Sequence, residues 1–243
     1  MNWDVWAFRL VFVAFVGGFL AQMSTRLKLI QAAPNNFTFD HVGARFDRFV
    51  SEVVFQSKVI SARKAAGIAH LAVFWGFVAF GGFTAIEMLR GLGIVDLTHT
   101  TPFFVYKVLL LPFAVAVFVG IVGLAIRRGI VRPAGLGPTV SKESLLIALF
   151  IALLMVTYFI SFAYETGLVG RVNWWVHMLI ILVFMVLVPN SKHLHLILSP
   201  ATVFLKSPVL GTVPNLDFEK EEVGLETVKD LPSKMVLDAF SCV

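Results

Sequence analysis

The sequence predicts an all-α integral membrane protein, a bundle of five transmembrane helices with the N-terminus outside and the C-terminus in the cytoplasm. Charge is scarce, since 14% of the 243 residues are Asp, Glu, Lys or Arg, against about 25% in soluble domains. Hydrophobic residues make up 58% of the chain and gather in five stretches of about 20 residues, the length that crosses a bilayer as a helix. The single cysteine, Cys242, excludes an intrachain disulfide and a CxxC metal cradle within this sequence.

The five predicted spans follow one another along the first 200 residues. They are Val5–Met23, Ala65–Met88, Pro102–Ile126, Leu145–Tyr164 and Trp174–Leu198. The first is interpreted as a retained helix and not as a secretory signal, because no Lys or Arg precedes its apolar run and basic residues follow it. The connection Arg26–Lys64 has an amphipathic pattern, which predicts a helix lying at the membrane interface.

The basic residues of the connections predict the orientation. Seven Lys and Arg separate the first two spans and four separate the third and fourth, whereas the other two connections carry one each. Basic connections stay in the cytoplasm, so this alternation predicts a multi-pass protein of the cell inner (cytoplasmic) membrane. The net charge of +5 therefore reflects topology, and no aromatic-interleaved basic patch of the kind that binds nucleic acid is present in the sequence.

Composition divides the chain into two regions. Residues 1–200 are predicted to form the five-helix membrane domain. Residues 201–243 are predicted to form an acidic, water-facing tail in the cytoplasm. The acidic residues of this tail are Glu219, Glu221, Glu222, Glu226, Asp230 and Asp238.

Three histidines lie within predicted spans, where a polar side chain is costly and is retained mostly for function. His177 and His195 are 18 residues apart, which is five turns of one helix, so both imidazoles are predicted to face the same side about 27 Å apart. His70 and His195 share the cytoplasmic side, where one imidazole from each of two helices can hold an iron porphyrin. We therefore expect His70 and His195 to ligate the iron of one b-type haem. Hydrogen-bonded packing histidines are the alternative.

Two stretches of the sequence resemble a known family. These are Gly67-Ile-Ala-His70-Leu-Ala and Trp175-Val-His177, the latter followed by Val188-Pro-Asn-Ser-Lys-His-Leu-His195. They look like the gamma subunit of respiratory nitrate reductase, and closer still like the membrane domains of heterodisulfide-reductase-like iron–sulfur proteins. The resemblance covers about residues 1–205. It implies a membrane cytochrome b, a quinone-linked oxidoreductase that exchanges electrons between menaquinone or ubiquinone and a cytoplasmic iron–sulfur partner.

The resemblance also assigns haem ligands. It implies that His70 and His195 bind an inner haem and that His177 is one ligand of an outer haem. The second ligand of the outer haem would lie ten residues after His70, where this chain has Phe80, and Phe has no atom that ligates iron. The sequence thus predicts one haem b, and His177 either has another partner ligand or faces the quinone.

Three charged residues near the outer ends of the spans bear on the quinone. Lys107 lies in the first turns of the third span, and Glu87 and Glu165 lie at the outer ends of the second and fourth. A quinol loses its protons as it gives up electrons, and these groups with His177 are predicted to bind quinone oxygens and relay protons. The alternative is structural, in which Lys107 pairs with a carboxylate or extends to the interface.

The end of the chain bears on the iron–sulfur partner. The stretch from Leu231 to Cys242 resembles the lead-in to a ferredoxin-like cysteine motif in the fused proteins of that family. It implies 4Fe–4S clusters in a partner or in a further C-terminal part. A haem-free membrane transporter or anchor subunit is the alternative function. A discontinuous helix would favour transport, and Pro189-Asn190 is the candidate position for one.

Overall fold

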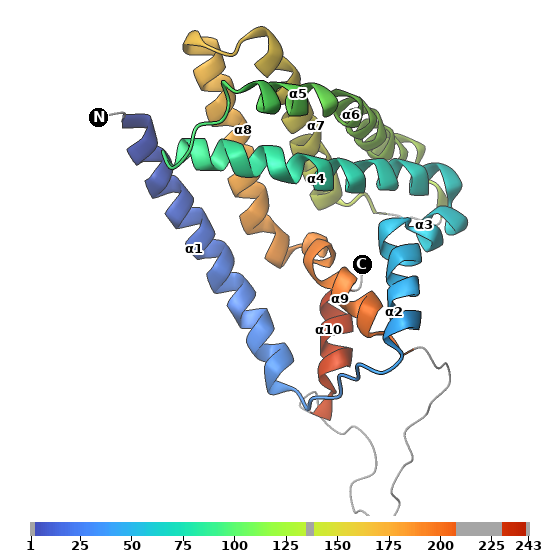
Figure 1. The fold of residues 1–243 in the computed structure, drawn as a ribbon. Coiled ribbons are helices and arrows are strands. Elements are labelled where there is room, and N and C mark those ends of the chain that lie inside the picture. Colours follow the sequence, from blue (N-terminus) through green and yellow to red (C-terminus); the bar gives the residue numbers. More distant parts are fainter. Residues whose placement is uncertain (1–2, 135–138, 208–229, 242–243) are drawn as a thin grey trace, which may run out of the picture. The chain divides into compact units, whose positions relative to one another are not determined.

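The structure is a computed structural model that describes residues 3–134, 139–207 and 230–241. Within these residues the chain is helical and contains no strand (Figure 1). It divides into two compact units, which are described separately. The first unit is Met1–Gly17 with Val59–Leu187, and the second is Gly18–Lys58 with Val188–Val243.

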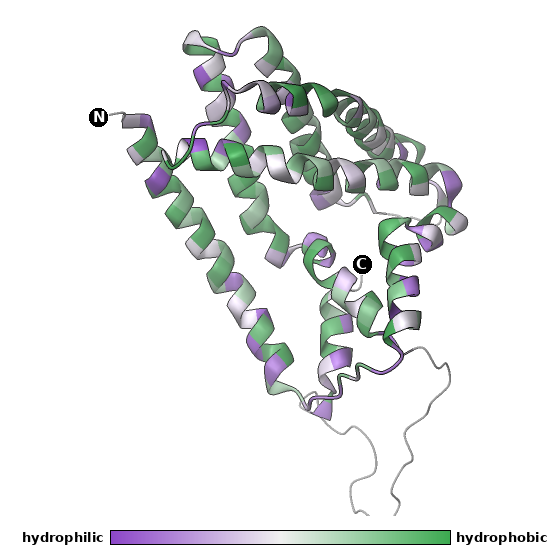
Figure 2. Ribbon diagram, in the orientation of Figure 1, coloured by the Kyte–Doolittle hydropathy of each residue, from purple (hydrophilic) through white to green (hydrophobic). Residues whose placement is uncertain are grey.

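Five long apolar helices in the described residues confirm the predicted fold class. Each is long and apolar enough to cross a bilayer, and Figure 2 shows hydrophobic residues predominating along them. Four of them are single helices, namely α1 Trp3–Ala32, α4 Lys64–Gly91, α7 Lys142–Ala163 and α8 Gly167–Leu187. The third span in chain order consists of three consecutive segments, which are α5 Thr101–Leu109, α6 Leu111–Ile126 and the π-helical turn η2 Arg127–Val131. Many of their apolar side chains, such as Leu10 and Val119, point outward, as lipid-facing residues do. The orientation across the membrane stays a prediction from the charges.

The third span is divided into two helices near Pro112. Proline has no backbone N–H and its ring clashes with the carbonyl one turn earlier, so α5 ends at Leu109. The hydroxyl of Thr100 caps the start of α5 by accepting the N–H of Phe103 at 3.4 Å. Lys107 therefore lies in a short helix of its own, which is fixed at both ends.

The fifth span is discontinuous, which corrects the predicted helix Trp174–Leu198. Its segments are α8 Gly167–Leu187, the 3-10 turns η4 Val188–Asn190 and η5 Lys192–Leu194, and α9 His195–Leu205. Pro189 donates no backbone hydrogen bond, and the residue before a proline is driven away from helical geometry. The histidine that opens α9 therefore lies on a different helix from His177, and the prediction that the two share one helix face five turns apart is wrong.

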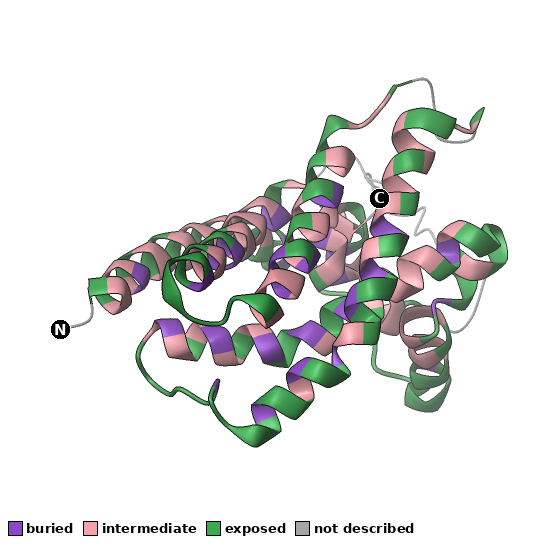
Figure 3. Cartoon of the chain, turned by 90° about the horizontal axis from the view of Figure 1, so that it is seen from above, coloured by how far each residue is buried: buried purple, intermediate pink, exposed green. Residues whose placement is uncertain are grey.

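Aromatic residues form the core of the first unit. Phe80 and Phe83 of α4 meet Tyr158 of α7 edge to face, with ring centroids 4.8 and 5.4 Å apart. Phe83 also stacks on Phe103 of α5 at 5.6 Å, and such pairs gain about 0.5–1.5 kcal/mol beyond their burial. Figure 3 shows buried residues recurring at intervals along the long helices. Phe80, the position where a second haem ligand was sought, is thus part of a packed aromatic core.

Close packing of α4 against α6 depends on Gly76. A Cβ at this position would lie 2.0 Å from Cγ2 of Val117, which is buried and stiff. We expect Gly76→Leu to destabilise the protein by about 1–3 kcal/mol. Gly81→Leu is the matched control, because a Cβ on Gly81 of the same helix meets nothing within 4 Å. Thermal unfolding in detergent measures both, and equal melting temperatures would contradict the close approach.

The second unit has an apolar core of its own. It joins Met23 and Ile30 of α1, Leu198 of α9 and Leu237 of α10 (Ser233–Ser241). The helix predicted after α1 is present as three short segments. They are α2 Val42–Phe49, the π-helical turn η1 Val50–Val54 and α3 Ser57–Ala62.

The start of α10 is fixed to the segment that follows α1. The hydroxyl of Ser233 donates to the carbonyl of Ala33 at 2.9 Å, and its backbone N–H donates to the carbonyl of Pro34 at 2.9 Å. Most of the acidic tail lies outside the described residues, as does Cys242. The tail residues concerned are Glu219, Glu221, Glu222 and Glu226.

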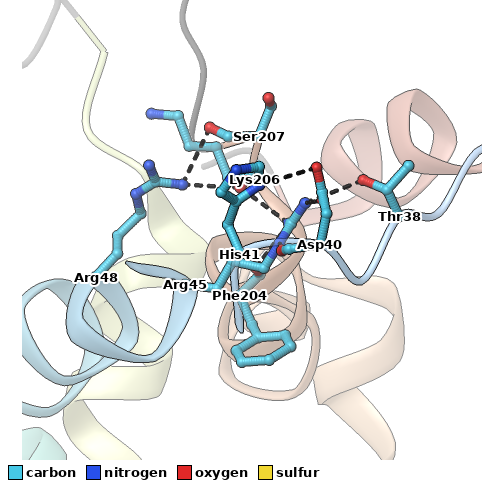
Figure 4. A network of polar contacts seen from close by, with 8 residues as sticks. All are labelled: Thr38, Asp40, His41, Arg45, Arg48, Phe204, Lys206 and Ser207. Atoms are coloured by element: carbon cyan, nitrogen blue, oxygen red, sulfur yellow. Dashed lines mark hydrogen bonds and ion pairs between the residues drawn. The ribbon is translucent and has the colours of Figure 1, made fainter. Parts of the chain in front are cut away.

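A fully buried arginine, Arg45, closes the C-terminal end of α9 (Figure 4). Its Nη1 donates to the carbonyls of Phe204 and Lys206 at 3.2 and 3.1 Å. Its Nε donates to the carbonyl of Asp40 at 2.6 Å. Its Nη2 donates to Thr38 Oγ1 at 3.0 Å and to Asp40 Oδ1 at 2.5 Å. A guanidinium has five N–H donors, and five acceptors surround this one, while the cation favours the negative end of the α9 dipole.

The contact with Arg45 makes part of the stability of the second unit depend on pH. Hydrogen bonds from Arg45, and then from His41, lower the pKa of Asp40 from 3.8 to about 2. Because the folded-state pKa is depressed, the stabilisation is complete above pH 3.8 and is lost as the pH falls toward 2. We expect the amide protection factors of α2 and α9 to fall across this window and to stay flat in Asp40→Asn. The same acid dependence in both proteins would contradict the ion pair.

Candidate functional site

Four of the six predicted site residues line one cavity in the first unit, here called the inner cavity. Glu87 comes from near the end of α4 and Lys107 from α5. Glu165 comes from the turn between α7 and α8, and His177 comes from α8. The four side chains belong to separate segments, so the packing of the helices and not a local motif brings them together.

Lys107 is buried, and three groups surround its ammonium. Nζ donates to the carbonyl of Ser161 at 3.0 Å, lies 3.8 Å from Oε1 of Glu165, and sits 4.6 Å from the centroid of the Phe162 ring. The hydroxyl of Tyr158 donates to the Lys107 carbonyl, which fixes α5 against α7. The side chain of Lys107 is 7% exposed and that of Glu165 is 54% exposed. The pair therefore links a buried cation to a solvent-accessible carboxylate. Such a pair is expected whether Lys107 has a structural role or relays protons.

Glu87 is buried against a tryptophan and an arginine. Nε1 of Trp174 donates to Oε2 of Glu87 at 2.7 Å, and Nη2 of Arg90 lies 2.7 Å from the same oxygen. The guanidinium of Arg90 also lies over the Trp174 ring, 5.4 Å from its centroid. Both donors meet one carboxylate oxygen, so these three side chains form one hydrogen-bonded wall.

His177 is held at the wall of the inner cavity by α7. Its Nδ1 lies 2.6 Å from Oγ1 of Thr157, and its ring meets Phe83 edge to face at 6.3 Å. Nδ2 of Asn173 donates to the Thr157 carbonyl at 2.8 Å. Two hydrogen bonds thus join α8 to α7 at the level of the imidazole.

The inner cavity adjoins a larger cavity in the same unit, here called the chamber. The inner cavity has about 50 Å³ of free space, enough for one or two waters of about 30 Å³ each and too little for a porphyrin. The chamber has about 510 Å³, within the range of small-molecule sites. Both are lined by Arg90, Glu165, Gly170 and Trp174, so these residues form a shared wall.

Charges of both signs line the chamber. Arg171 donates from Nη2 to Oδ1 of Asp4 at 2.9 Å, and Nε1 of Trp175 donates to the same oxygen at 3.0 Å. Hydrogen bonds from the side chain and backbone of Thr98 lower the pKa of Asp96 below its ordinary value, so Asp96 is ionised at neutral pH. The chamber therefore offers both hydrogen-bond donors and hydrogen-bond acceptors to a ligand.

Three residues of the site were not found by sequence reasoning, namely Arg90, Trp174 and Thr157. Arg90 follows Glu87 at the i,i+3 spacing of a helical ion pair, and this spacing could have identified it. Trp174 and Thr157 reach the site through contacts between helices, for which the sequence gives no local signal.

The two remaining predicted residues, His70 and His195, belong to different units. His70 is half-buried in α4 of the first unit, and His195 opens α9 of the second. Nδ1 of His195 lies 2.7 Å from the carbonyl of Lys192. A carbonyl only accepts, so Nδ1 carries a hydrogen, and the neutral form of such a ring has its lone pair on Nε2, the form in which histidine binds a metal. The pairing of His70 with His195 stays a prediction.

The chain is similar to two curated proteins. It is 29% identical over 227 residues to "Probable iron-sulfur-binding oxidoreductase FadF" of Bacillus subtilis. It is 25% identical over 232 residues to "EtfAB:quinone oxidoreductase" of Syntrophomonas wolfei. The matches cover 78% and 77% of this chain and 32% of each relative, so the chain spans about a third of the length of the curated relatives it matches. No protein-family model matches the chain, and no solved structure matches it.

Both of these relatives are named as oxidoreductases. One name refers to iron–sulfur binding and the other to quinone. Both terms agree with the resemblance to iron–sulfur, quinone-linked proteins that the sequence predicts. The likeness to the nitrate reductase gamma subunit, the haem and its ligands stay predictions.

Proposed function

We propose that this chain is the membrane electron-transfer part of a quinone-linked oxidoreductase. It exchanges electrons between menaquinone or ubiquinone and an iron–sulfur partner on the cytoplasmic side, through b-type haem. One observation carries the proposal, which is the convergence of Glu87, Lys107, Glu165 and His177 on the inner cavity. Three of these residues lie within membrane-length helices, where ionisable side chains are costly, and their meeting with the exposed Glu165 at one cavity indicates a site that handles protons.

The chamber is the proposed place of the quinone ring. Its size suits a small aromatic headgroup, and Trp174 and Arg90 offer it a flat, cationic wall. Glu165 borders both cavities and reaches water, while Lys107 pairs with it from the buried side. A proton released by a quinol passes from the buried groups to Glu165 and then to solvent.

His70 and His195 are the proposed axial ligands of one haem b. The tautomer of His195 suits this role, because its Nε2 carries the lone pair. When bound, the haem supplies a one-electron carrier, and the 4Fe–4S clusters belong to a partner or to a further part of the protein. The surroundings of His177 suit a second haem poorly, because little free space adjoins it and Phe80 is packed in the core.

A pyridine haemochrome assay on the purified full chain tests this function. We expect about one haem per chain in the native protein and loss of the haem signal in His195→Ala and in His70→Ala, because an axial ligand is removed. His99→Ala, in an exposed loop, is the matched control and should keep its haem. Native protein without haem, or a full signal in His195→Ala, would overturn the proposed electron route.

A haem-free transporter or anchor subunit is the second candidate, and the break between α8 and α9 favours it. Discontinuous helices line substrate sites in transporters. At this break, however, the side chain of Asn190 accepts from Arg26 and donates to Gln22, so its polar groups are used in holding the second unit together. Correctly inserted protein that never contains haem would favour this candidate.

A further inference from the structure

The contacts of Thr157 indicate the hydrogen-bonding state of His177. The hydroxyl oxygen of Thr157 lies 2.9 Å from the carbonyl of Leu153 and 3.0 Å from the carbonyl of Leu154. A carbonyl only accepts, so the single hydroxyl hydrogen points to these carbonyls and the oxygen is left as an acceptor. Nδ1 of His177, 2.6 Å away, therefore carries the ring hydrogen, and Nε2 carries the lone pair.

The lone pair on Nε2 is an accessible acceptor that meets no polar group of the described residues. Among residues 3–134, 139–207 and 230–241, the polar contact of the His177 ring is the one made by Nδ1. The residue is 8% exposed and lines the inner cavity. An acceptor that lines a cavity can take a hydrogen bond from a ligand that enters it, so a donor placed in the inner cavity would meet its partner at Nε2.

We infer that Nε2 of His177 accepts a hydrogen bond from the hydroxyl of a quinol, and that Thr157 is the positioning residue that keeps Nε2 unprotonated for this contact. The inference rests on the proposed function and adds the redox form that the site recognises. A quinol hydroxyl donates, whereas a quinone carbonyl only accepts. The site therefore binds the reduced form in preference to the oxidised form.

The two cavities accommodate the two parts of such a ligand. The free space of the inner cavity admits a hydroxyl group, and the chamber admits a ring. The side chains of Arg90, Trp174 and Glu165 separate the two. For the hydroxyl of a ring in the chamber to reach His177, these shared side chains must move aside.

Nitrogen-15 NMR of the full chain in lipid nanodiscs, with labelled histidine, tests the assignment directly. The His177 signals are identified by their loss in His177→Gln. We expect a protonated Nδ1 and an unprotonated Nε2 in the native protein. Thr157→Ser keeps the hydroxyl and should keep this tautomer, whereas Thr157→Val, of nearly equal size, should produce a mixture of both tautomers. A protonated Nε2 in the native protein, or no change in Thr157→Val, would overturn the role of Thr157.

Titration with a short naphthoquinol, menadiol, tests the ligand. We expect menadiol to shift the Nε2 resonance and menadione, its oxidised form, to leave it unchanged. Thr157→Val should weaken menadiol binding by about fivefold to tenfold and leave menadione binding as it was. Equal responses to both redox forms would overturn the preference for the quinol. Loss of haem from His177→Gln would overturn the inference as well, because Nε2 would then be an iron ligand.

The outcomes separate this inference from the proposed function. If the native protein contains haem and Nε2 does not respond to menadiol, the inference fails and the electron route stands. If Nε2 responds to menadiol and no haem is present, the electron route fails and the quinol site stands.

Discussion

Replacing Arg45 with Met is expected to lower the free energy of unfolding of the second unit by about 3–5 kcal/mol. The substitution removes the cation that five hydrogen bonds hold in place, and it takes from the carbonyls of Phe204 and Asp40 the donors that Arg45 supplies. Hydrogen exchange measured by mass spectrometry in nanodiscs provides the readout. The amides of α2 and α9 should exchange at least about 100-fold faster than in the native protein.

Two variants control this prediction. Arg45→Lys keeps the charge but has one point of donation where the guanidinium has a planar fork, so it should recover only a small part of the lost stability. Arg48→Met removes a neighbouring arginine that also donates to the Lys206 carbonyl, at 2.8 Å, from a more exposed position. It should cost no more than about 1 kcal/mol. Equal effects of Arg45→Met and Arg48→Met would refute the claim that the buried guanidinium contributes more stability than the exposed one.

Replacing Lys107 with Met is expected to slow quinol oxidation by about 100-fold or more while the haem content stays unchanged. Met has a similar length and removes the only donor and charge of the side chain, so the pairing with Glu165 is lost. Positioned acid–base groups contribute about 10²–10⁴-fold to rates. Stopped-flow absorbance of haem reduction by a short-chain quinol, with the full chain in nanodiscs, measures the rate.

Lys142→Met is the matched control for Lys107. Lys142 lies exposed at the start of α7 and lines neither the inner cavity nor the chamber, so its replacement should leave the rate as it was. Glu165→Gln should have a smaller effect than Lys107→Met, because water can reach the side chain of Glu165 and substitute for it. An unchanged rate in Lys107→Met would leave Lys107 with a purely structural role.

The spans were predictable because hydropathy averaged over about 20 residues distinguishes a helix surrounded by lipid from one surrounded by water. Hydropathy favoured a continuous helix across the break after α8, with Pro189-Asn190 named only as a candidate position, since Val188 and Leu194 keep the average around it apolar although Pro189 ends the helix. Proline acts through one missing N–H and one steric clash, and neither changes an average over 20 residues. The division of the third span at Leu110 escaped prediction for the same reason.

The site was predictable to the extent that it consists of charges in an apolar setting. Lys107 and Glu87 stand out in the sequence because a bilayer tolerates few such residues. Thr157 does not stand out, because a helical threonine can bond its hydroxyl to the carbonyls of the preceding turn and then counts as apolar. Its function is visible only when the ring of His177 is placed beside it.

The packing of α10 within the second unit determines where a protein segment that followed α10 would be attached. Ser233 is bonded to the chain after α1, and Leu237 is buried in the apolar core. A redox module joined to α10 by a short linker would have an effective concentration in the millimolar range. Its encounter with the second unit would then be insensitive to dilution, whereas a module on a separate chain would have to be recruited from solution.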